Sequence, residues 1–204
     1  MLREIVIPNN NEAEFAEIAS KLGIKKLIFL YGFDDFNEKL QKRVEELNGY
    51  KGIRVEIGLI VNQKNIKKSR KNQGLIVAKS SGKDRFFIES GKVDLMYGFE
   101  EISNKDYLHQ RASGLNHILC DLLKRNGITV GFSYGSLGKS QETPLLIGRM
   151  MQNIMLCQKY RVKTAIASFS GNQYSLRSPH DVISLFSLLG MDTKTAKESL
   201  ENPI

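Results

Sequence analysis

Short runs of apolar, mostly β-branched residues recur along the chain, and segments with helical periodicity separate them. We predict seven of these runs to be strands, namely Leu2 to Ile7, Lys26 to Tyr31, Ile53 to Val61, Leu75 to Lys79, Val93 to Tyr97, Ile128 to Ser133 and Lys163 to Ser168. Their near-continuous apolar character is typical of strands that are covered on both faces. The pattern therefore predicts a parallel sheet.

The segments between the strands place apolar residues at helical spacing. The first of them, Glu12 to Leu22, has Asn11 as an N-cap and Gly23 as a stop. The further helices predicted in this way are Asp35 to Leu47, Gly114 to Asn126, Thr143 to Tyr160, Ser178 to Leu189 and a terminal helix capped by Asp192. Strands that alternate with helices require right-handed crossovers. The pattern leaves open whether the sheet closes into a barrel or stays an open, doubly wound sheet.

The chain has 204 residues, of which 41% are hydrophobic, so it can bury a full core without disulfides or metals. No internal repeat or linker divides it, and we expect a single domain over residues 1–204. The formal net charge of +8 favours acidic partners, such as nucleic acid, over neutral metabolites.

Two cysteines, Cys120 and Cys157, lie far apart in predicted helices, where free cysteine usually packs as a small hydrophobe. This usage fits a reducing compartment. The segment from Met1 to Pro8 is too short and too polar for a signal peptide, and no apolar run is long enough to span a bilayer. We therefore expect a cytoplasmic protein that makes no membrane contact.

The segment Gly131 to Gly135 matches the G-x-S-x-G pattern of a nucleophile elbow centred on Ser133. That elbow requires a helix directly after the serine, whereas glycines and polar residues separate Ser133 from the helix predicted at Thr143. The one downstream histidine, His180, has only its sequence neighbour Asp181 as an acidic partner. These features disfavour an esterase.

The overlapping stretch Ser133 to Ser140 approaches the P-loop pattern G-x-x-x-x-G-K-[ST], but a serine replaces the first glycine. A phosphate-binding loop also needs its helix to begin at the Lys-Ser pair, and the segment Gln141 to Pro144 delays that start. We interpret the stretch as a basic loop between a strand and a helix.

A catalytic metal centre would need several histidines and carboxylates at the strand ends. The chain has only His109, His117 and His180, and the apolar segment Ile5 to Ile7 of the first strand offers no ligand. We therefore expect no catalytic residue, no metal and no cofactor.

Positive charge gathers in two sets of residues. Lys64, Lys67, Lys68, Arg70 and Lys71 form a cluster that either neutralises phosphates or is a solvated helix face. The second set is dispersed over the later part of the chain and comprises Arg111, Lys124, Arg125, Lys139, Arg149, Lys159, Arg161, Lys163 and Arg177. Its arginines are the more telling members, because their planar fork matches phosphate and stacks on unpaired bases.

The later part of the chain also carries an ordered set of motifs. They are Arg111 to His117, Gly131 to Ser133, Arg149 to Tyr160, Ala167 to Gly171, Ser175 to Asp181 and Leu189 to Met191. In order and spacing this set resembles ribonuclease P protein component 3, an archaeal and eukaryotic family of barrel subunits. The order of predicted elements matches that family over nearly the whole chain.

This resemblance implies an α/β, TIM-barrel-like fold of the type found in the polymerase-and-histidinol-phosphatase (PHP) group of metal phosphoesterases. It also implies a role as a protein cofactor in a complex whose RNA removes the 5′ leader of precursor tRNA. The expected partners are the ribonuclease P RNA, precursor tRNA through the complex, and other protein subunits, especially a small RNA-binding one. The scarcity of histidine agrees with a barrel that has lost its metals.

The resemblance carries over to single positions of this sequence. The residues that it leads us to expect in contact with RNA are Arg111, His117, Lys159, Arg177 and Lys197, and the dispersed basic set adds Lys124 and Arg125. The residues expected to support them are Gly114, Ser133, Ser168, Pro179 and Asp181. The cluster Lys64, Lys67, Lys68, Arg70 and Lys71 is a candidate for an extra basic patch.

Two of these positions have structural alternatives. Asp181 lies near a helix start, where it favours the helix dipole and can orient Arg177. His117 precedes Asp121 by four residues on one helix face and can equally be a partly buried histidine. The acidic residue that commonly precedes the family's histidine is Asn116 here, so we infer no ion pair at that point.

Two other functions stay open. One is a metal-dependent phosphoesterase of the PHP type, which metal analysis and a phosphodiester assay would identify. The other is a protein-binding scaffold whose charge serves only solubility, which salt-sensitive capture of RNA would argue against.

Overall fold

The computed structural model describes residues 1–69, 74–103, 105–138 and 142–201, and it contains one sheet of seven strands in the order β1 to β7. The strands are β1 (Arg3–Val6), β2 (Lys26–Gly32), β3 (Arg54–Val61), β4 (Leu75–Lys79), β5 (Leu95–Tyr97), β6 (Thr129–Ser133) and β7 (Thr164–Ala167). Each strand pairs in parallel with the next. All seven predicted strands are therefore confirmed, and so is the parallel sheet.

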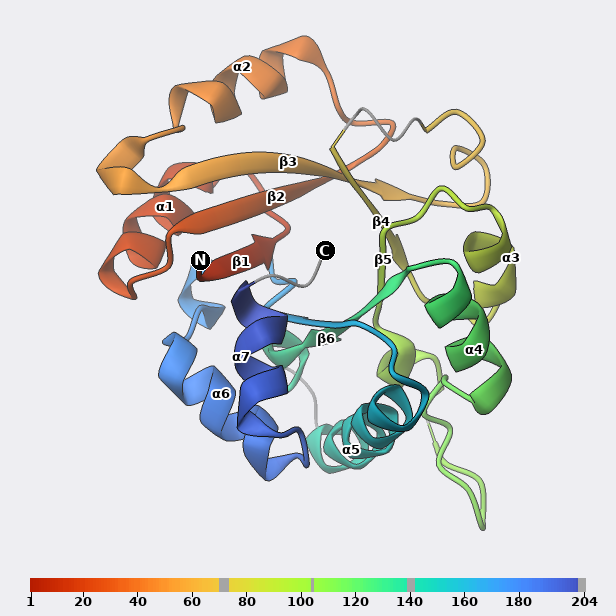
Figure 1. Cartoon of the computed structure of the whole chain (residues 1–204). Coiled ribbons are helices and arrows are strands. Elements are labelled where there is room, and N and C mark those ends of the chain that lie inside the picture. Colours follow the sequence, from red (N-terminus) through yellow and green to blue (C-terminus); the bar gives the residue numbers. More distant parts are fainter. Residues whose placement is uncertain (70–73, 104, 139–141, 202–204) are drawn as a thin grey trace.

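The sheet closes on itself through its first and last strands. The amide of Phe169 donates to the carbonyl of Ile5, and the amide of Ile7 donates to the carbonyl of Ser170, both at 3.0 Å. These bonds decide the question that the sequence pattern left open, because an open sheet would keep its edges apart. The fold is a TIM-barrel-like α/β barrel, and Figure 1 shows its strands surrounded by helices.

Helices connect the strands and cover the outside of the barrel. They are α1 (Glu12–Lys21), α2 (Glu38–Glu46), α3 (Asp84–Glu89), α4 (His117–Arg125), α5 (Thr143–Tyr160), α6 (Pro179–Leu188) and α7 (Thr193–Glu201). The sequence pattern predicted six of them but missed α3, which has only six residues. Short 3₁₀ turns add η1 (Tyr50–Gly52), η3 (Phe99–Glu101), η4 (Tyr134–Ser136) and η5 (Gln173–Ser175).

Two helices begin later than predicted because an asparagine caps them. The side chain of Asn37 accepts a hydrogen bond from the amide of Leu40, and α2 therefore starts at Glu38 instead of Asp35. In the same way Asn116 caps α4. Such caps satisfy amides that lack a partner inside the helix, so they fix the first residue.

Alternating residues of the strands fill the inside of the barrel. This interior cluster comprises Ile5, Ile28, Leu30, Val77, Leu95, Tyr97, Ala165, Ala167 and Phe169. A period of two along each strand sends every second side chain inward, so the interior is a packed core and not a pore.

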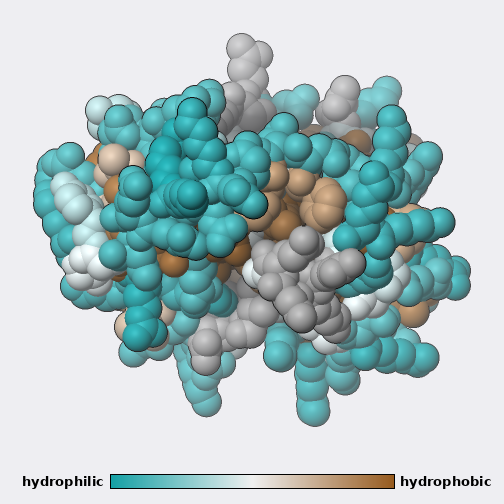
Figure 2. Space-filling model, turned by 90° about the horizontal axis from the view of Figure 1, so that it is seen from above, coloured by the Kyte–Doolittle hydropathy of each residue, from teal (hydrophilic) through white to brown (hydrophobic). Residues whose placement is uncertain are grey.

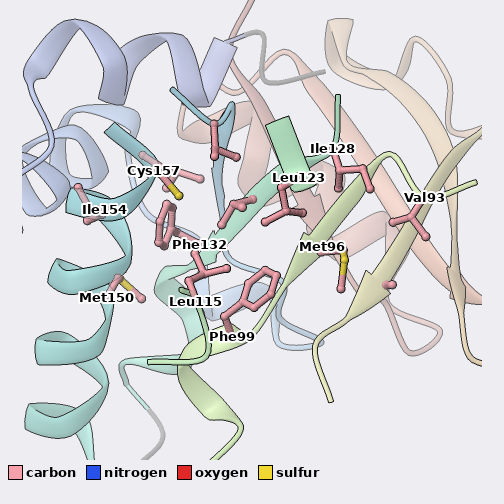
Figure 3. Packing of buried hydrophobic residues seen from close by; sticks show 14 of the residues in the cluster. Val93, Met96, Phe99, Leu115, Leu123, Ile128, Phe132, Met150, Ile154 and Cys157 are labelled. Atoms are coloured by element: carbon pink, nitrogen blue, oxygen red, sulfur yellow. The ribbon is translucent and has the colours of Figure 1, made fainter. Parts of the chain in front are cut away.

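The opposite faces of the strands pack against the helices. On one side of the barrel Met150, Ile154 and Cys157 of α5 lie against Phe132 of β6, as Figure 3 shows. Both cysteines are free and buried, and burial raises the pKa of the Cys120 thiol to about 11. Their prediction as packed small hydrophobes is confirmed. None of the helices in the described ranges combines the length and the apolar character needed to cross a bilayer.

Candidate nucleic-acid interface

The carboxyl ends of the strands surround a pocket of about 380 Å³ at the mouth of the barrel. In parallel barrels this end carries the functional loops. Here the rings of Tyr97 and Phe169 stack across the mouth, and Lys79 pairs with Glu101 at 2.7 Å. Across the described ranges, no three His, Cys, Asp or Glu side chains come close enough together to bind a metal ion. The prediction that the protein uses no catalytic metal stays a prediction.

Ser133 does not form a nucleophile elbow. It ends β6 and is followed by the turn η4, while the next helix begins only at Thr143. Its hydroxyl is buried and donates to the carbonyl of Ser168 at 2.9 Å. His180 lies on the surface at the start of α6. Lys139 and Ser140 of the P-loop-like stretch lie outside the described residues.

Arg177 lies in the loop between β7 and α6, at the carboxyl end of the barrel. One nitrogen of its guanidinium, Nη1, donates to the carbonyls of Tyr174 and Leu176 at 2.9 and 2.8 Å. These two bonds hold an exposed arginine in one orientation without neutralising its charge. Arg177 therefore presents a fixed cation to the solvent, as phosphate recognition requires.

The motif that follows Arg177 starts helix α6. Pro179 occupies the first turn, and the hydroxyl of Ser178 donates to the Asp181 carboxylate at 2.8 Å while accepting from the Asp181 amide at 3.3 Å. This reciprocal arrangement caps the helix. Among the described contacts Asp181 makes no ion pair with Arg177. The contacts of Asp181 with Ser178 are those of a residue that stabilises the start of α6.

Arg111 lies on another loop of the same end, between η3 and α4. Its Nη1 donates to the carbonyl of Gly148 in α5 at 2.5 Å. A side chain at Gly148 would press on the guanidinium, since an added Cβ would lie 3.0 Å from its central carbon. The glycine therefore lets Arg111 lie flat against the helix while its charge stays exposed.

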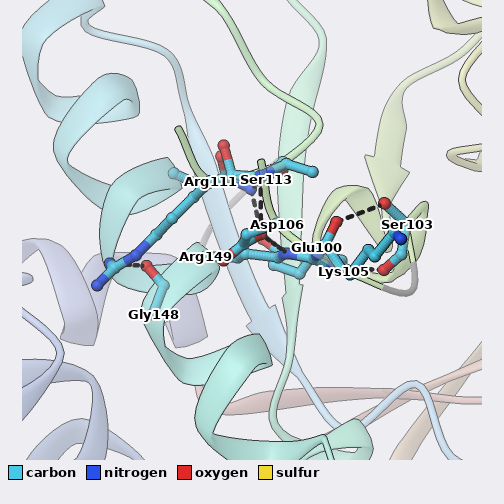
Figure 4. A network of polar contacts seen from close by, with 10 residues as sticks. Glu100, Ser103, Lys105, Asp106, Arg111, Ser113, Gly148 and Arg149 are labelled. Atoms are coloured by element: carbon cyan, nitrogen blue, oxygen red, sulfur yellow. Dashed lines mark hydrogen bonds and ion pairs between the residues drawn. The ribbon is translucent and has the colours of Figure 1, made fainter. Parts of the chain in front are cut away.

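Arg149 is not a surface cation, which corrects its place in the dispersed basic set. It is completely buried, and it donates to the carbonyls of Glu100 and Ser103 and to the Asp106 carboxylate at 2.6 to 2.9 Å. Asn153, one turn later, donates to the Glu100 carboxylate at 2.9 Å. Figure 4 shows this network between α5 and the loop that carries Arg111. Arg149 thus holds the loop between η3 and α4 in place from its buried side.

Glu100 lies at the centre of that network. Burial raises the pKa of its carboxyl to about 7, against the lowering effect of the bond from Asn153. One signal in the sequence points to this arrangement: the polar residues Arg149 and Asn153 lie four positions apart on the inner face of a helix, where apolar residues are the rule.

His117 begins α4 and is exposed, so the alternative of a partly buried histidine is wrong. Asp121, its expected neighbour, pairs instead with Arg125 at 2.7 Å. Asn116, which replaces an acidic residue here, accepts from the Leu119 amide at 2.9 Å and caps the helix. His117 therefore lies at the carboxyl end of the barrel, on the same side as Arg111.

The other predicted RNA contacts lie at the opposite end of the barrel. Lys124 and Arg125 occupy the last turn of α4, and Lys159 occupies the last turn of α5, where each helix returns to the amino end of the next strand. Lys197 lies on α7, which approaches the start of β7 through a contact of 2.6 Å between Ser199 and Thr164. The predicted set is therefore divided between two ends.

The extra basic patch follows β3. Lys64, Lys67 and Lys68 are exposed there in consecutive turns, not on a helix face, and Arg70 and Lys71 lie outside the described residues. Since the patch follows a strand, it also lies at the carboxyl end. Buried Ile66 anchors the turns, and the side-chain amide of Asn65 donates to the Asp34 carboxylate at 3.1 Å.

Helix α2, at the top of Figure 1, covers a different face. Figure 2 shows that hydrophilic residues cover most of the surface seen from above, around a hollow lined by hydrophobic ones. The charged residues of α2 balance, with three basic ones against three acidic ones, Glu38, Lys39, Lys42, Arg43, Glu45 and Glu46. A helix of mixed charge offers little attraction to RNA.

Two of the supporting motif residues are structural. Gly114 has a φ of +81°, and a Cβ there would lie 2.4 Å from the carbonyl oxygen of Phe99. The amide of Ser168 donates to the carboxylate of Glu4 in β1 at 2.5 Å. Both residues therefore hold loops at the carboxyl end in place.

Glu4 joins the two ends of the sheet. Its carboxylate accepts from the Ser168 amide and from the Tyr134 hydroxyl at 2.7 Å, and burial raises its pKa to about 7 in spite of these donors. Glu4 is not among the residues predicted from the sequence. The available signal was a glutamate next to the apolar run Ile5 to Ile7, inside a strand covered on both faces.

Comparison with known proteins identifies the family. The family described as RNase P subunit p30 matches residues 3–204. The chain belongs to this family. The resemblance inferred from the motifs is therefore confirmed, and the match extends well beyond the part of the chain in which those motifs lie.

Curated relatives of this chain carry the name Ribonuclease P protein component 3. The protein from Thermococcus kodakarensis is 28% identical over 172 residues, which cover 79% of this chain and 72% of the relative. The protein from Methanosarcina mazei is 23% identical over 170 residues, covering 80% and 70%.

Solved structures show the same fold. A chain from the cryo-EM structure of an archaeal ribonuclease P with mature tRNA superposes with a TM-score of 0.80 at 18% identity, covering 98% of this chain and 87% of that one. A lactonase from Listeria monocytogenes reaches 0.54 at 8% identity, covering 99% and 93%. The barrel is thus shared with proteins of different activity, and the fold by itself names no function.

Proposed function

We propose that the chain is a protein subunit of ribonuclease P that binds and supports the catalytic RNA during removal of the 5′ leader of precursor tRNA. The observation that carries the proposal is the family match over residues 3–204.

The RNA-binding surface in this proposal is the carboxyl end of the barrel. Arg111, His117 and Arg177 all lie there and are exposed, and the exposed lysines of the extra basic patch lie at the same end. Two of these cations are held in fixed orientations by backbone carbonyls. Fixed cations lose little side-chain entropy when they bind phosphate, which favours them over freely moving lysines.

The remaining predicted contacts, Lys124, Arg125, Lys159 and Lys197, form a second group at the amino end. A small protein subunit and a large RNA can occupy opposite ends of one barrel. We therefore assign the carboxyl end to RNA, and the amino-end group serves as the internal comparison that tests this assignment.

Reconstitution tests the function. The ribonuclease P RNA and the other protein subunits of the source organism are assembled with and without this chain, and cleavage of precursor tRNA is measured at moderate magnesium. We expect the chain to raise the cleavage rate several-fold while the isolated chain cleaves nothing. Equal rates with and without the chain would refute the proposal, and hydrolysis of a generic phosphodiester by the isolated chain would favour a PHP-type phosphoesterase instead.

A further inference from the structure

A second pocket opens beside Arg177 at the carboxyl end of the barrel. It has a volume of about 600 Å³ and lies between η4, α5 and the loop from β7 to α6. Its volume falls within the roughly 300 to 1,000 Å³ that is typical of small-ligand sites. We call it the Tyr174 pocket, after the aromatic residue at its rim.

One side of the Tyr174 pocket is apolar. Ile147 of α5 and Val182 and Leu185 of α6 line it, together with Leu137. Tyr174 has 73% of its surface exposed, which is unusual for a large aromatic residue with apolar neighbours. An exposed ring beside an apolar wall is suited to a flat apolar ligand.

The other side is polar and carries both signs of charge. The Nη1 atom of Arg177 is bound to backbone carbonyls, but its Nε and Nη2 atoms have no partner among the described contacts. The Asp181 carboxylate also lines the pocket; it accepts from the Ser178 hydroxyl at 2.8 Å and lies 4.0 Å from Nδ1 of the exposed His180. The pocket thus presents two unused donors and a charged acceptor next to the ring of Tyr174.

We propose that the Tyr174 pocket binds one unpaired nucleotide of the RNA, with its base stacked on Tyr174 and its phosphate on Arg177. This inference rests on the proposed function. Unpaired bases stack on aromatic side chains and are read along their polar edges, whereas bases inside a duplex cannot reach such a ring. An apolar protein side chain would fill the wall but would leave the donors of Arg177 unused.

The acceptor sets a preference among bases. Asp181 can accept a hydrogen bond from an exocyclic amino group, as acidic side chains do from cytosine N4. Uracil has a carbonyl oxygen at that position, which the carboxylate would repel. The pocket therefore prefers cytosine, with its amino group at position 4, to uracil.

Binding of two short single strands tests the pocket. Fluorescence anisotropy at low salt compares labelled deca-cytidylate with deca-uridylate on the full chain. We expect about tenfold tighter binding of deca-cytidylate. Tyr174→Ala should weaken its binding roughly tenfold, and Tyr174→Phe should restore it because the ring is kept.

Asp181→Ala tests the base preference separately. The ratio of the two affinities should fall toward one, and thermal unfolding shows whether α6 stays folded without its cap partner. Tyr50→Ala is the matched control, since Tyr50 is also exposed and has Lys51 5.4 Å from its ring centroid, but lies in η1, just before β3. It should bind both strands as the unchanged chain does.

The outcomes separate the pocket from the proposed function. Equal affinity of the unchanged chain and of Tyr174→Ala for deca-cytidylate would overturn the pocket. If Tyr174→Ala loses binding to a protein subunit but keeps its binding to RNA, the pocket belongs to that partner and the inference is equally overturned. Reconstituted cleavage is measured in parallel with the unchanged chain, and its failure would refute the subunit role whatever the short strands do.

Discussion

The ring of Tyr97 lies parallel to the ring of Phe169, with centroids 4.3 Å apart and planes 5° apart. Gly131 makes this stack possible, because an added Cβ would come within 3.0 Å of both residues. Phe169 adopts a φ of 45°, a conformation that side chains rarely take, so its packing has to offset the strain. The stack therefore depends on the glycine at position 131 and on a backbone conformation that its own packing stabilises.

Removing one ring should cost stability. We expect Phe169→Ala to lower the free energy of unfolding by about 3 kcal/mol, since it leaves a cavity in the barrel interior. Chemical denaturation measures the change. Phe86→Ala is the control, because Phe86 is 42% exposed and its loss should cost less than about 1 kcal/mol. Equal costs for both variants would contradict a structural role of the stack.

Two glycines with similar backbones should respond differently to alanine. Gly114 and Gly127 have φ values of +81° and +67°, but an added Cβ meets the Phe99 carbonyl only at Gly114 and meets nothing at Gly127. Gly127→Ala should cost about 1 kcal/mol from backbone strain alone. Gly114→Ala should cost more, and thermal unfolding compares the two. A smaller loss at Gly114 would show that the loop yields easily.

Arg149 should matter for the loop that carries Arg111. Arg149→Met leaves buried carbonyls and Asp106 without their partner, so we expect a loss of about 3 kcal/mol in the free energy of unfolding. Limited proteolysis should then cut between residues 105 and 112 before the rest of the chain. Arg85→Met, at an exposed i,i+4 pair, should change neither result.

The stability of the protein should fall as the pH rises toward neutrality. Burial raises the pKa of Glu4 and of Glu100 from 4.5 to about 7. Between these pH values the unfolded chain has released protons that the folded chain still holds, so the free energy of unfolding decreases from about pH 4.5 to about pH 7. Urea denaturation at several pH values measures this slope. Glu4→Gln and Glu100→Gln together should flatten it, and an unchanged slope would assign it to other groups.

The two ends of the barrel should differ in their effect on RNA binding. Arg111→Ala and Arg177→Ala should each weaken binding of the ribonuclease P RNA and reduce its salt dependence by about one unit of slope. Lys124→Ala and Lys159→Ala, at the amino end, should leave both nearly unchanged. If the amino-end variants show the larger effect, the RNA binds at that end and our assignment is wrong.

The sequence alone was sufficient for the strands. Runs such as Leu75 to Lys79 are apolar because both faces of a barrel strand are covered, and that local property is visible in any window. Closure of the barrel was not visible, since it depends on Ile5 meeting Phe169 across the whole chain. Helix α3 was missed because six residues give too little periodicity to recognise.

The candidate site was less predictable than the fold. Arg149 was grouped with surface cations because arginine is seldom fully buried, and the partners that permit its burial are more than forty residues away in the sequence. That the predicted RNA contacts lie at two opposite ends of the barrel could have been foreseen from the sequence. Lys124 and Lys159 end helices, whereas Arg111 and Arg177 follow strands, and a parallel barrel places these positions at opposite ends.

The bond between Glu4 and Ser168 spans 164 positions of the chain. During synthesis the first strand leaves the ribosome long before the residue that its carboxylate needs has been made. Until Ser168 has been made, the Glu4 carboxylate lacks this donor and is better solvated than buried. Strand β1 therefore takes its final place in the barrel among the last steps of folding. Assembly with a partner that needs the finished carboxyl-end loops would therefore wait until the chain has been made past Ser168.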